Sequence, residues 1–385
     1  MRDATDQKWA TADLASVSKV FTDGNWIETK DQASEGIRLV QTGNVGEGVF
    51  KDRRDKARWI DDQTFDRLNC FEVMPGDCLV SRLPDPVGRA CIIPETGDKM
   101  ITAVDCTVIR PDEAKIDPQF FVYYSQSSEY LRNVDDRCTG TTRRRISRKN
   151  LGKIPIPLPP LEEQQRIVAV LDEAFEGLTR ARAHAEANLQ NAQDLFESLR
   201  FVMLSEQTEG WETHPLADCF RLKSGENLTA KKMVPGPFPV YGGNGIAGTH
   251  DACNLSGDNV IIGRVGALCG NARYIDHDIW LTDNAFKVVN YNFDFDHRFL
   301  AYLLNFKNLR SLARQAAQPV ISNSSLADLE LTFPASVELQ ADLAVKLANA
   351  ETELEDIQKK YEAKLQDLDD LRQSLLQKAF AGELT

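Results

Sequence analysis

Positive charge is concentrated in one short segment of this sequence. Residues 137–149 read RCTGTTRRRISRK and hold six cationic side chains and no acidic one, in a chain whose formal net charge is −13. Arginine presents a planar fork of N–H donors that matches phosphate oxygens and the major-groove edge of guanine, so the segment predicts contact with nucleic acid. The alternative is a solvated basic loop. The candidate contact residues are Arg143, Arg144, Arg145, Ser147, Arg148 and Lys149.

Smaller cationic groups occur in both halves of the chain. Residues 51–58 read KDRRDKAR, in which two aspartates dilute the basic residues, and the candidates there are Lys51, Arg53 and Arg54, with Arg58 close by. Lys231 and Lys232 offer the same chemistry in the second half. Arg82 and Arg264 stand at matched strand ends, where DNA contact and an internal salt bridge are equally good interpretations.

Uncharged polar candidates come from two further segments. In YGGNGIAG (241–248) the glycines fit turns, or less readily a phosphate cradle, and Tyr241 or Asn244 is a candidate for facing DNA. The segment AAQPVISNSS (316–325) corresponds to the basic segment but carries no charge. There Gln318, Ser322 and Asn323 either hydrogen-bond to bases and phosphates or act as turn and capping residues.

Motifs that would give the chain chemistry of its own are missing from the sequence. It contains no NPPY or DPPY to hold a flipped adenine, no GxGxxG after a strand and no GxxxxGK[ST]. The PDEAK of residues 111–115 resembles a nuclease motif only faintly, because its carboxylates are adjacent in sequence. The sequence therefore predicts no catalytic residue and no bound cofactor.

Composition limits the class of protein further. A mass of 43.1 kDa with 42% hydrophobic and 27% charged residues fits a soluble protein of two or more domains. Eight cysteines without a CxxC pair, and only five histidines, argue against a metal site and for reduced thiols. No apolar run is long enough to span a membrane, and the first residues do not resemble a secretory signal, so a cytoplasmic location is expected.

The chain contains one unit twice. The segment GKIPIPLPPLEEQ (152–164) aligns with ADLELTFPASVEL (327–339), and PGDCLVSRLPDPVGRA (75–90) aligns with SGDNVIIGRVGALCGNA (256–272). Trp9 precedes Asp13 and Leu14 much as Trp211 precedes Pro215 and Leu216. The aligned pairs include Ile146 with Ile321, Ser147 with Ser322, Pro159 with Pro334, Gln165 with Gln340, Asp77 with Asp258, Arg82 with Arg264 and Gly88 with Gly270.

Each copy reads as a mixed region followed by a long helix. Short β-rich runs bounded by Gly, Pro, Asn and Asp, with small helices over about 118–131 and 296–312, predict an α+β fold. Proline followed by acidic residues predicts the start of each long helix. The predicted divisions are an N-terminal region 1–160, a helix 161–204, a second region 205–336 and a final helical segment 337–385.

A heptad seam runs along both predicted helices in one register. In the first helix it is Leu171, Ala174, Leu178, Ala181, Ala185, Asn188, Ala192, Leu195, Leu199 and Val202. In the second it is Leu347, Ala350, Leu354, Ile357, Tyr361, Lys364, Leu368, Leu371, Leu375 and Lys378. Two copies of one unit pack most simply about a pseudo-twofold axis, which predicts antiparallel helices forming a coiled-coil spacer. In that arrangement Asn188 and Tyr361 are expected to approach each other.

The residues also carry a family resemblance. The repeated junction LGKIPIPLPPLEEQQRIVAVLDE, the ending LRQSLLQKAFAGEL and the YGGNGIAG stretch are similar to the specificity (S) subunit of Type I restriction-modification systems, and the resemblance covers essentially the whole chain. The second junction departs from the family pattern, because Glu330 and Thr332 stand where the first junction has prolines.

The resemblance implies a DNA-reading subunit without catalysis. Two target recognition domains would each read one half of a split, asymmetric site on double-stranded DNA, and the helices would set the gap between the halves. The helices would also dock two methyltransferase (M) subunits, which bind S-adenosylmethionine and methylate adenine, and restriction (R) subunits would join them. The rival interpretation is a two-headed coiled-coil scaffold whose heads bind proteins.

Overall fold

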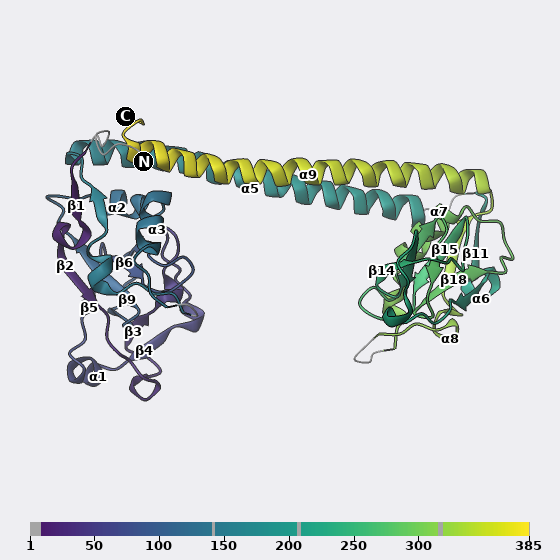
Figure 1. Cartoon of the computed structure of the whole chain (residues 1–385), viewed down its shortest axis with the longest axis horizontal. Helices are drawn as coiled ribbons and strands as arrows, with labels where there is room; N and C mark the ends of the chain where they lie inside the picture. Colours follow the sequence, from purple (N-terminus) through teal and green to yellow (C-terminus); the bar gives the residue numbers. More distant parts are fainter. Residues whose placement is uncertain (1–8, 141–142, 206–208, 315–318, 385) are drawn as a thin grey trace. The chain divides into compact units, whose positions relative to one another are not determined.

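The computed structural model describes residues 9–140, 143–205, 209–314 and 319–384. The chain forms two compact units, of which unit 1 comprises residues 1–185 and 363–385 and unit 2 comprises residues 186–362. Each of the two long helices is therefore shared between the units, with about half of its length in each (Figure 1). Below, head 1 means residues 9–160 of unit 1 and head 2 means residues 209–336 of unit 2.

Unit 1 is built from ten short strands and four short helices around part of the long ones. The strands are β1 (Thr11–Asp13), β2 (Ser18–Asp23), β3 (Ile37–Val40), β4 (Arg58–Ile60), β5 (Glu72–Val73), β6 (Cys78–Ser81), β7 (Ala90–Ile92), β8 (Met100–Thr102), β9 (Cys106–Pro111) and β10 (Pro155–Pro157). The α-helices are α1 (Asp62–Arg67), α2 (Pro118–Tyr124), α3 (Ser128–Asp135), α4 (Arg148–Leu151) and the first half of α5 (Leu161–Ser205). Short 3₁₀ turns are η1 (Leu14–Val17), η2 (Thr29–Asp31), η3 (Thr42–Asn44) and η4 (Arg54–Lys56).

Unit 2 repeats this inventory with small changes. Its strands are β11 (Trp211–Pro215), β12 (Arg221–Ser224), β13 (Phe238–Gly242), β14 (Gly245–His250), β15 (Asn259–Gly263), β16 (Ala272–Ile275), β17 (Trp280–Leu281), β18 (Ala285–Val289) and β19 (Glu330–Pro334). Its helices are α6 (Leu216–Cys219), α7 (His297–Phe306), α8 (Asn323–Leu326) and the first half of α9 (Val337–Ala381), with η5 (Ala230–Lys232) and η6 (Leu309–Leu312).

The strand order confirms the internal repeat. Head 1 has an antiparallel sheet in the order β2-β9-β6-β7, and head 2 has the matching sheet β12-β18-β15-β16. A second sheet in each head contains one parallel pair, β3 with β8 and β13 with β17. Both heads are therefore the same α+β unit, as the sequence predicted. The helix expected over 118–131 is two helices, because Ser127 caps a new helix at α3.

The proline-rich junction is one strand of a two-stranded ribbon. β10 pairs with β1 in head 1, and β19 pairs with β11 in head 2. Proline lacks the N–H that a central strand would need, so a two-stranded ribbon with a free edge accommodates Pro155 and Pro157. The ribbon leads directly into α5, and in Figure 1 β1 lies beside the start of that helix.

A buried glutamine in the first turn of α5 joins that helix to head 1. The side chain of Gln164 is fully buried, and its Nε2 donates to the carbonyls of Lys115 and Pro159, both at 2.9 Å. Its Oε1 accepts the backbone N–H of Asp117 at 2.8 Å, and Asp117 in turn caps α2. One side chain thus connects the helix start, the junction and the loop that begins α2.

Gln340 makes the same three contacts in head 2. It is fully buried, its Nε2 donates to Asp294 O (3.3 Å) and Pro334 O (2.8 Å), and its Oε1 accepts from Asp296 N (3.0 Å). The sequence alignment that paired Gln340 with Gln165 is wrong by one residue, since Gln165 is exposed. The second junction has one more residue between the proline and the glutamine.

Residues from both long helices complete each core. The core of unit 1 includes Leu171 and Phe175 of α5 together with Leu376 and Phe380 of α9. The core of unit 2 includes Leu204, from the end of α5, and residues 344 and 347, from the start of α9. Within each unit the two helices therefore run antiparallel, as predicted. Arg182 of α5 also pairs with Asp369 of α9 in unit 1.

The buried seam differs from the predicted one at alternate positions. One stripe of α5 is buried or half-buried throughout, and it consists of Leu171, Phe175, Leu178, Arg182, Ala185, Leu189, Ala192, Phe196, Leu199 and Met203. Of the predicted positions off this stripe, Ala174 and Ala181 are half-buried as well, whereas Asn188, Leu195 and Val202 are exposed. In the C-terminal half of α9 they include Tyr361, Leu365, Leu368, Arg372, Leu375 and Ala379. The spacing is four then three instead of three then four. Leu171, Leu178, Leu354 and Tyr361 keep their predicted places, whereas Asn188, Leu195 and Leu371 are exposed.

The physical reason for the shift is side-chain size. The predicted stripe and the observed stripe of α5 both contain apolar residues. The observed stripe has Phe175, Leu189 and Phe196 where the predicted one has Ala174, Asn188 and Leu195, and the larger side chains bury more apolar surface. Leu195 is 71% exposed, one position from Phe196. Because Asn188 is exposed and Leu189 takes the seam position, Asn188 is not the buried polar residue that would fix the register.

None of the helices in the described part of the chain combines the length and the apolar character that crossing a membrane requires.

The glutamine contacts can be tested by comparing two neighbouring substitutions. Gln164→Ala leaves two carbonyls and one N–H without their buried partner, and we expect it to lower the free energy of unfolding by about 2–4 kcal/mol. Gln165→Ala, at the exposed neighbour, should change it by less than about 0.5 kcal/mol. Urea unfolding followed by circular dichroism measures both, and equal effects would contradict the assigned register.

The seam is tested by a second adjacent pair. Phe196→Ala removes a half-buried ring from the helix interface and should cost about 1–3 kcal/mol. Leu195→Ala, on the exposed side, should be nearly neutral. Thermal unfolding of the two variants separates the phases: a larger loss for Leu195→Ala would favour the seam first predicted from the sequence.

Candidate nucleic-acid interface

The arginine-rich segment of head 1 belongs to the second arm of a short hairpin, the arm that contains Arg145. Thr139 and Arg145 form a β-bridge, and Arg143, Arg144 and Arg145 are all exposed. Arg144 pairs with Asp135 of α3 at 2.5 Å, and Arg145 lies 3.9 Å from a carboxylate oxygen of Asp105. Within the described chain, no acidic partner is found for Arg143.

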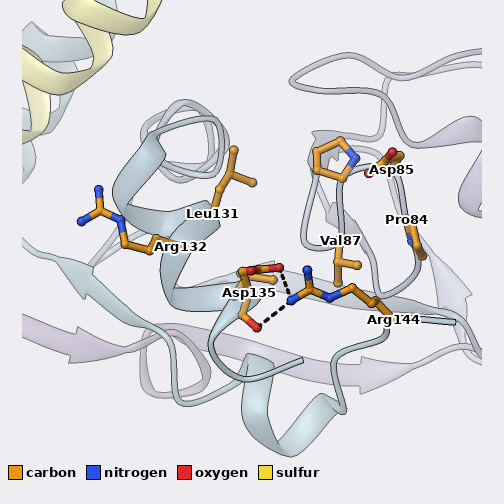
Figure 2. Close-up of a pocket in the computed structure, with 9 residues that line it drawn as sticks. Pro84, Asp85, Val87, Leu131, Arg132, Asp135 and Arg144 are labelled. Carbon is orange, nitrogen blue, oxygen red and sulfur yellow. Dashed lines mark hydrogen bonds and ion pairs between the residues drawn. The ribbon is translucent and has the colours of Figure 1, made fainter. Parts of the chain in front are cut away.

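Figure 2 shows the surroundings of the Arg144 pair. Arg144 and Asp135 meet at one side of a cavity of about 350 Å³. Leu131 and Arg132 of α3 line one side, and the loop that carries Asp85 and Val87 lines another. The ion pair between Arg144 and Asp135 joins the second arm of the hairpin to α3. The exposed arginines therefore project from a loop that is attached to a helix.

The residues after the hairpin gather around a second cavity. Ser147 caps α4, since its Oγ accepts the N–H of Asn150 at 3.2 Å. Arg148 and Lys149 follow in the first turn of α4, are exposed, and line a cavity of about 550 Å³ together with Ser147. Arg148 is 4.0 Å from Asp23. The structure thus brings these three predicted residues together.

Arg82 lines the same cavity but its side chain is only 4% exposed. Its guanidinium donates to the carbonyls of Ile146 and Val104 and lies 3.4 Å from the carboxylate of Asp23. The sequence left DNA contact and an internal salt bridge open for Arg82, and the structure contains the internal salt bridge, with Asp23. The strand-end position could not distinguish them, because both need the same residue type.

The second basic cluster of head 1 is exposed and rests on a buried arginine. Lys51, Arg53 and Arg54 are exposed, and Arg54 pairs with Asp98 at 2.6 Å. Arg38 of β3, which is 1% exposed, reaches the same carboxylate at 3.2 Å. The Arg54 guanidinium, with Arg38 beside it, holds the pKa of Asp98 below its usual range. Arg53, Arg58 and Lys56 border a polar cavity of about 270 Å³.

A further buried arginine was missed by the sequence analysis. Arg89 donates four hydrogen bonds to backbone carbonyls, those of Thr42 (2.9 Å), Val45 (2.7 Å), Leu83 (2.8 Å) and Pro86 (2.9 Å). It therefore ties the loop before the second basic cluster to the loop beside the Figure 2 cavity. No local signal distinguishes such an arginine from a solvated one, although Arg38, inside the apolar strand IRLV, could have been recognised as buried.

Two of the candidates in head 2 face inward. Tyr241 is 8% exposed and packs in a small core with residues 255 and 261, so its assignment as a DNA-facing side chain is corrected. Arg264 is half-buried, lies 5.3 Å from the ring centre of Phe286 and donates to Asp283 O at 3.4 Å. Tyr241 and Arg264 lie at strand ends, where the neighbouring loop decides whether a side chain is buried. The strand pattern alone therefore did not predict their burial.

Other candidates in head 2 have structural partners or are exposed. Ser322 caps α8 in a reciprocal pair with Ser325, and Asn323 bonds to both backbone groups of Leu222. Asn244 is exposed but accepts the N–H of Leu268 at 3.1 Å. Lys231 and Lys232 are exposed on η5. Gln318 lies outside the described residues.

All eight cysteines are free thiols, and six of them are buried. Burial raises the pKa of Cys91 and of Cys106 to about 12, so both stay protonated near neutral pH. In the described ranges there is also no cluster of His, Cys, Asp or Glu able to hold a metal ion.

Known proteins resemble the whole arrangement. The chain matches the model of the family described as "Type I restriction modification DNA specificity domain" over residues 7–188 and again over residues 208–367. It is 27% identical over 213 residues to the Type I restriction enzyme EcoprrI specificity subunit of Escherichia coli, a match that spans 52% of this chain and about half, 52%, of that protein. It is 28% identical over 319 residues to the putative type I specificity subunit S.MpnORF638P of Mycoplasma pneumoniae, covering 76% of this chain and 81% of that one.

Solved structures share the fold. A chain solved for the complex assembly and conformational transition of the type I R-M system superposes with a TM-score of 0.79 at 16% identity, over 98% of both chains. The HsdS subunit from Thermoanaerobacter tengcongensis superposes with a TM-score of 0.64 at 17% identity, over 98% of this chain and 97% of that one.

Proposed function

Since the chain belongs to the Type I restriction modification DNA specificity domain family, we propose that it is the sequence-reading subunit of a Type I restriction-modification enzyme. Head 1 reads one half of a split, asymmetric DNA site and head 2 reads the other half. The observation that carries this proposal is the repeat itself: one head with one strand order and one buried glutamine occurs twice, each ending in a 45-residue helix.

The charge pattern supports DNA as the ligand. The chain is acidic overall, so binding to phosphates needs local groups of cations. Head 1 presents two such groups, one at residues 143–149 and one at residues 51–58, and both stand on loops that buried arginines and ion pairs hold in place. A supported cationic loop can dock on a duplex with little loss of conformational freedom.

The two long helices are proposed to act as the spacer and as a docking surface. Each helix runs from one unit into the other, and we propose that the pair thereby sets the gap between the half-sites. Two methyltransferase subunits dock on the charged outer faces, carry S-adenosylmethionine and methylate adenine. Restriction subunits join that complex. This chain binds no cofactor and performs no chemical step, and it acts in the cytoplasm, where the DNA is.

The proposal is tested by selection from a random pool of DNA duplexes. The chain assembled with its methyltransferase subunits should enrich one asymmetric motif made of two short blocks separated by a fixed number of unspecified base pairs. The methyltransferase subunits alone serve as the control and should enrich no such motif. A single contiguous motif, or none, would count against the proposal and in favour of a scaffold whose heads bind proteins.

A further inference from the structure

An equivalent hairpin occurs in both heads. In head 1 Thr139 and Arg145 exchange two backbone hydrogen bonds, of 2.9 and 3.0 Å. In head 2 Arg314 and Val320 form the corresponding bridge, in which Arg314 N donates to Val320 O at 3.1 Å. The numbering offset is 175 for both arms, as 314 minus 139 and 320 minus 145 give.

The residue after each bridge fixes the hairpin to the sheet in the same way. Ile146 and Ile321 are fully buried. Ile146 N donates to Arg82 O at 3.2 Å, and Ile321 N donates to Arg264 O at 3.1 Å. The two hairpins are therefore equivalent residue by residue at their bases.

Their cations stand on opposite arms. In head 1 the second arm carries Arg145 and the first arm has Thr139. In head 2 the first arm carries Arg314, which is exposed, and the second arm has Val320. Directly opposed residues of an antiparallel bridge project to the same face, with Cβ atoms about 5 Å apart. Arg314 therefore projects from the face of its hairpin that corresponds to the Arg145 face in head 1.

The carboxylates around the hairpin change together with the cations. In head 1 three of the cations lie beside acidic groups, in the pairs Arg144 with Asp135, Arg145 with Asp105 and Arg148 with Asp23. Five cations (Arg143, Arg144, Arg145, Arg148 and Lys149) and these three carboxylates leave two net positive charges.

In head 2 none of the three acidic positions keeps a carboxylate. Ser224 takes the place of Asp23 beside the strand-end arginine, at 3.4 Å from Arg264. Asn284 takes the place of Asp105, because its carbonyl accepts the N–H of that arginine at 2.9 Å. At the same numbering offset of 175, Arg310 stands where head 1 has Asp135. The neighbouring Asp283 is bonded to Asn227 at 3.2 Å.

The equivalents of the five head 1 cations in head 2 are all uncharged. Arg310 and Arg314 supply two positive charges there, and Asp283 keeps its negative charge, because its partner Asn227 is a neutral amide. Arg310 is exposed, and its Nη1 donates to Ala267 O at 2.5 Å. In the part of the chain that the structure describes, no acidic side chain pairs with Arg314.

We propose, resting on the function proposed above, that Arg310 and Arg314 are the phosphate-contacting cations of head 2. Head 2 does this with two exposed arginines, Arg310 in η6 and Arg314 on the first arm of the hairpin. Head 1 uses five cations on and after the second arm, and three of them lie beside carboxylates. Arg310 and Arg314 position head 2 on the backbone of its half-site and leave base reading to neighbouring side chains.

The test measures how the affinity of the assembled complex for its selected duplex depends on salt. Each arginine that neutralises one phosphate contributes about 0.9 to the slope of log affinity against log salt. Arg314→Ala should lower that slope by about 1, and Arg310→Ala with Arg314→Ala by about 2, with weaker binding at every salt concentration. Selection with the variants should return both half-sites unchanged.

The control removes a charge of the same sign outside head 2 and outside the long helices. Lys19→Ala, at an exposed position of β2 in head 1, should leave the slope and the affinity as in the parent chain. An unchanged slope in the arginine variants, or a relaxed preference at one base pair, would overturn the assignment. A parent complex that selects no split motif would instead overturn the proposed function, so the two failures are distinguishable.

A transplant variant separates charge placement from local folding. Arg314→Thr combined with Val320→Arg copies the head 1 arrangement onto the head 2 hairpin. Because the bridge partners share a face, the moved guanidinium should restore the salt slope to within a few tenths of the parent value. A slope as low as that of Arg314→Ala would contradict the equivalence of the two arms.

Discussion

A buried glutamine at the start of each long helix is the contact on which the arrangement of each unit depends. Gln164 and Gln340 each satisfy two carbonyls and one N–H inside the protein, and these groups belong to the junction and to the loop that opens the next helix of the head. A head that rotated on its helix would leave all of them unpaired in a buried site, at a cost of several kcal/mol. The orientation of each head on its helix is therefore fixed by local hydrogen bonding, supported by the two-stranded junction ribbon.

The two heads keep one frame and vary what stands on it. The sheet order, the buried isoleucine after the hairpin and the backbone contacts of Arg82 and Arg264 recur in both. The charged side chains do not recur: head 1 has Arg145 on the second arm of its hairpin, and head 2 has Arg314 on the first arm. Under the proposed function, a constant frame with exchanged surface residues would allow each head to read a different sequence.

Periodicity and repetition made most of the fold predictable from the sequence. The α+β class, the two long helices and the duplication follow from patterns that repeat over many residues. The phase of the seam was wrong because two adjacent stripes of α5 are both apolar, and only the size of Phe175 and Phe196 favours the second. The one-residue error at Gln165 arose because a shift of that size within the second junction leaves the proline match intact.

The interface was less predictable, because residue type does not reveal burial or the partner across a bridge. Arg82 and Tyr241 are inside the protein although their types suit DNA contact. Arg314 was overlooked because it precedes the uncharged segment 316–325. Only its bridge to Val320 shows that it lies on the hairpin face that corresponds to the Arg145 face in head 1. Such information resides in pairing between strands, which a single sequence does not display.

The helices are proposed to set the distance between two independently reading heads. The most direct measurement inserts seven residues, one heptad, into α5 after Asn188 and seven into α9 at the matching level near Tyr361, and then repeats the selection from random duplexes with the assembled complex. A whole heptad preserves the seam, so the account predicts that both half-site sequences stay the same while the unspecified gap between them widens. Altered half-sites, or the original gap, would contradict it.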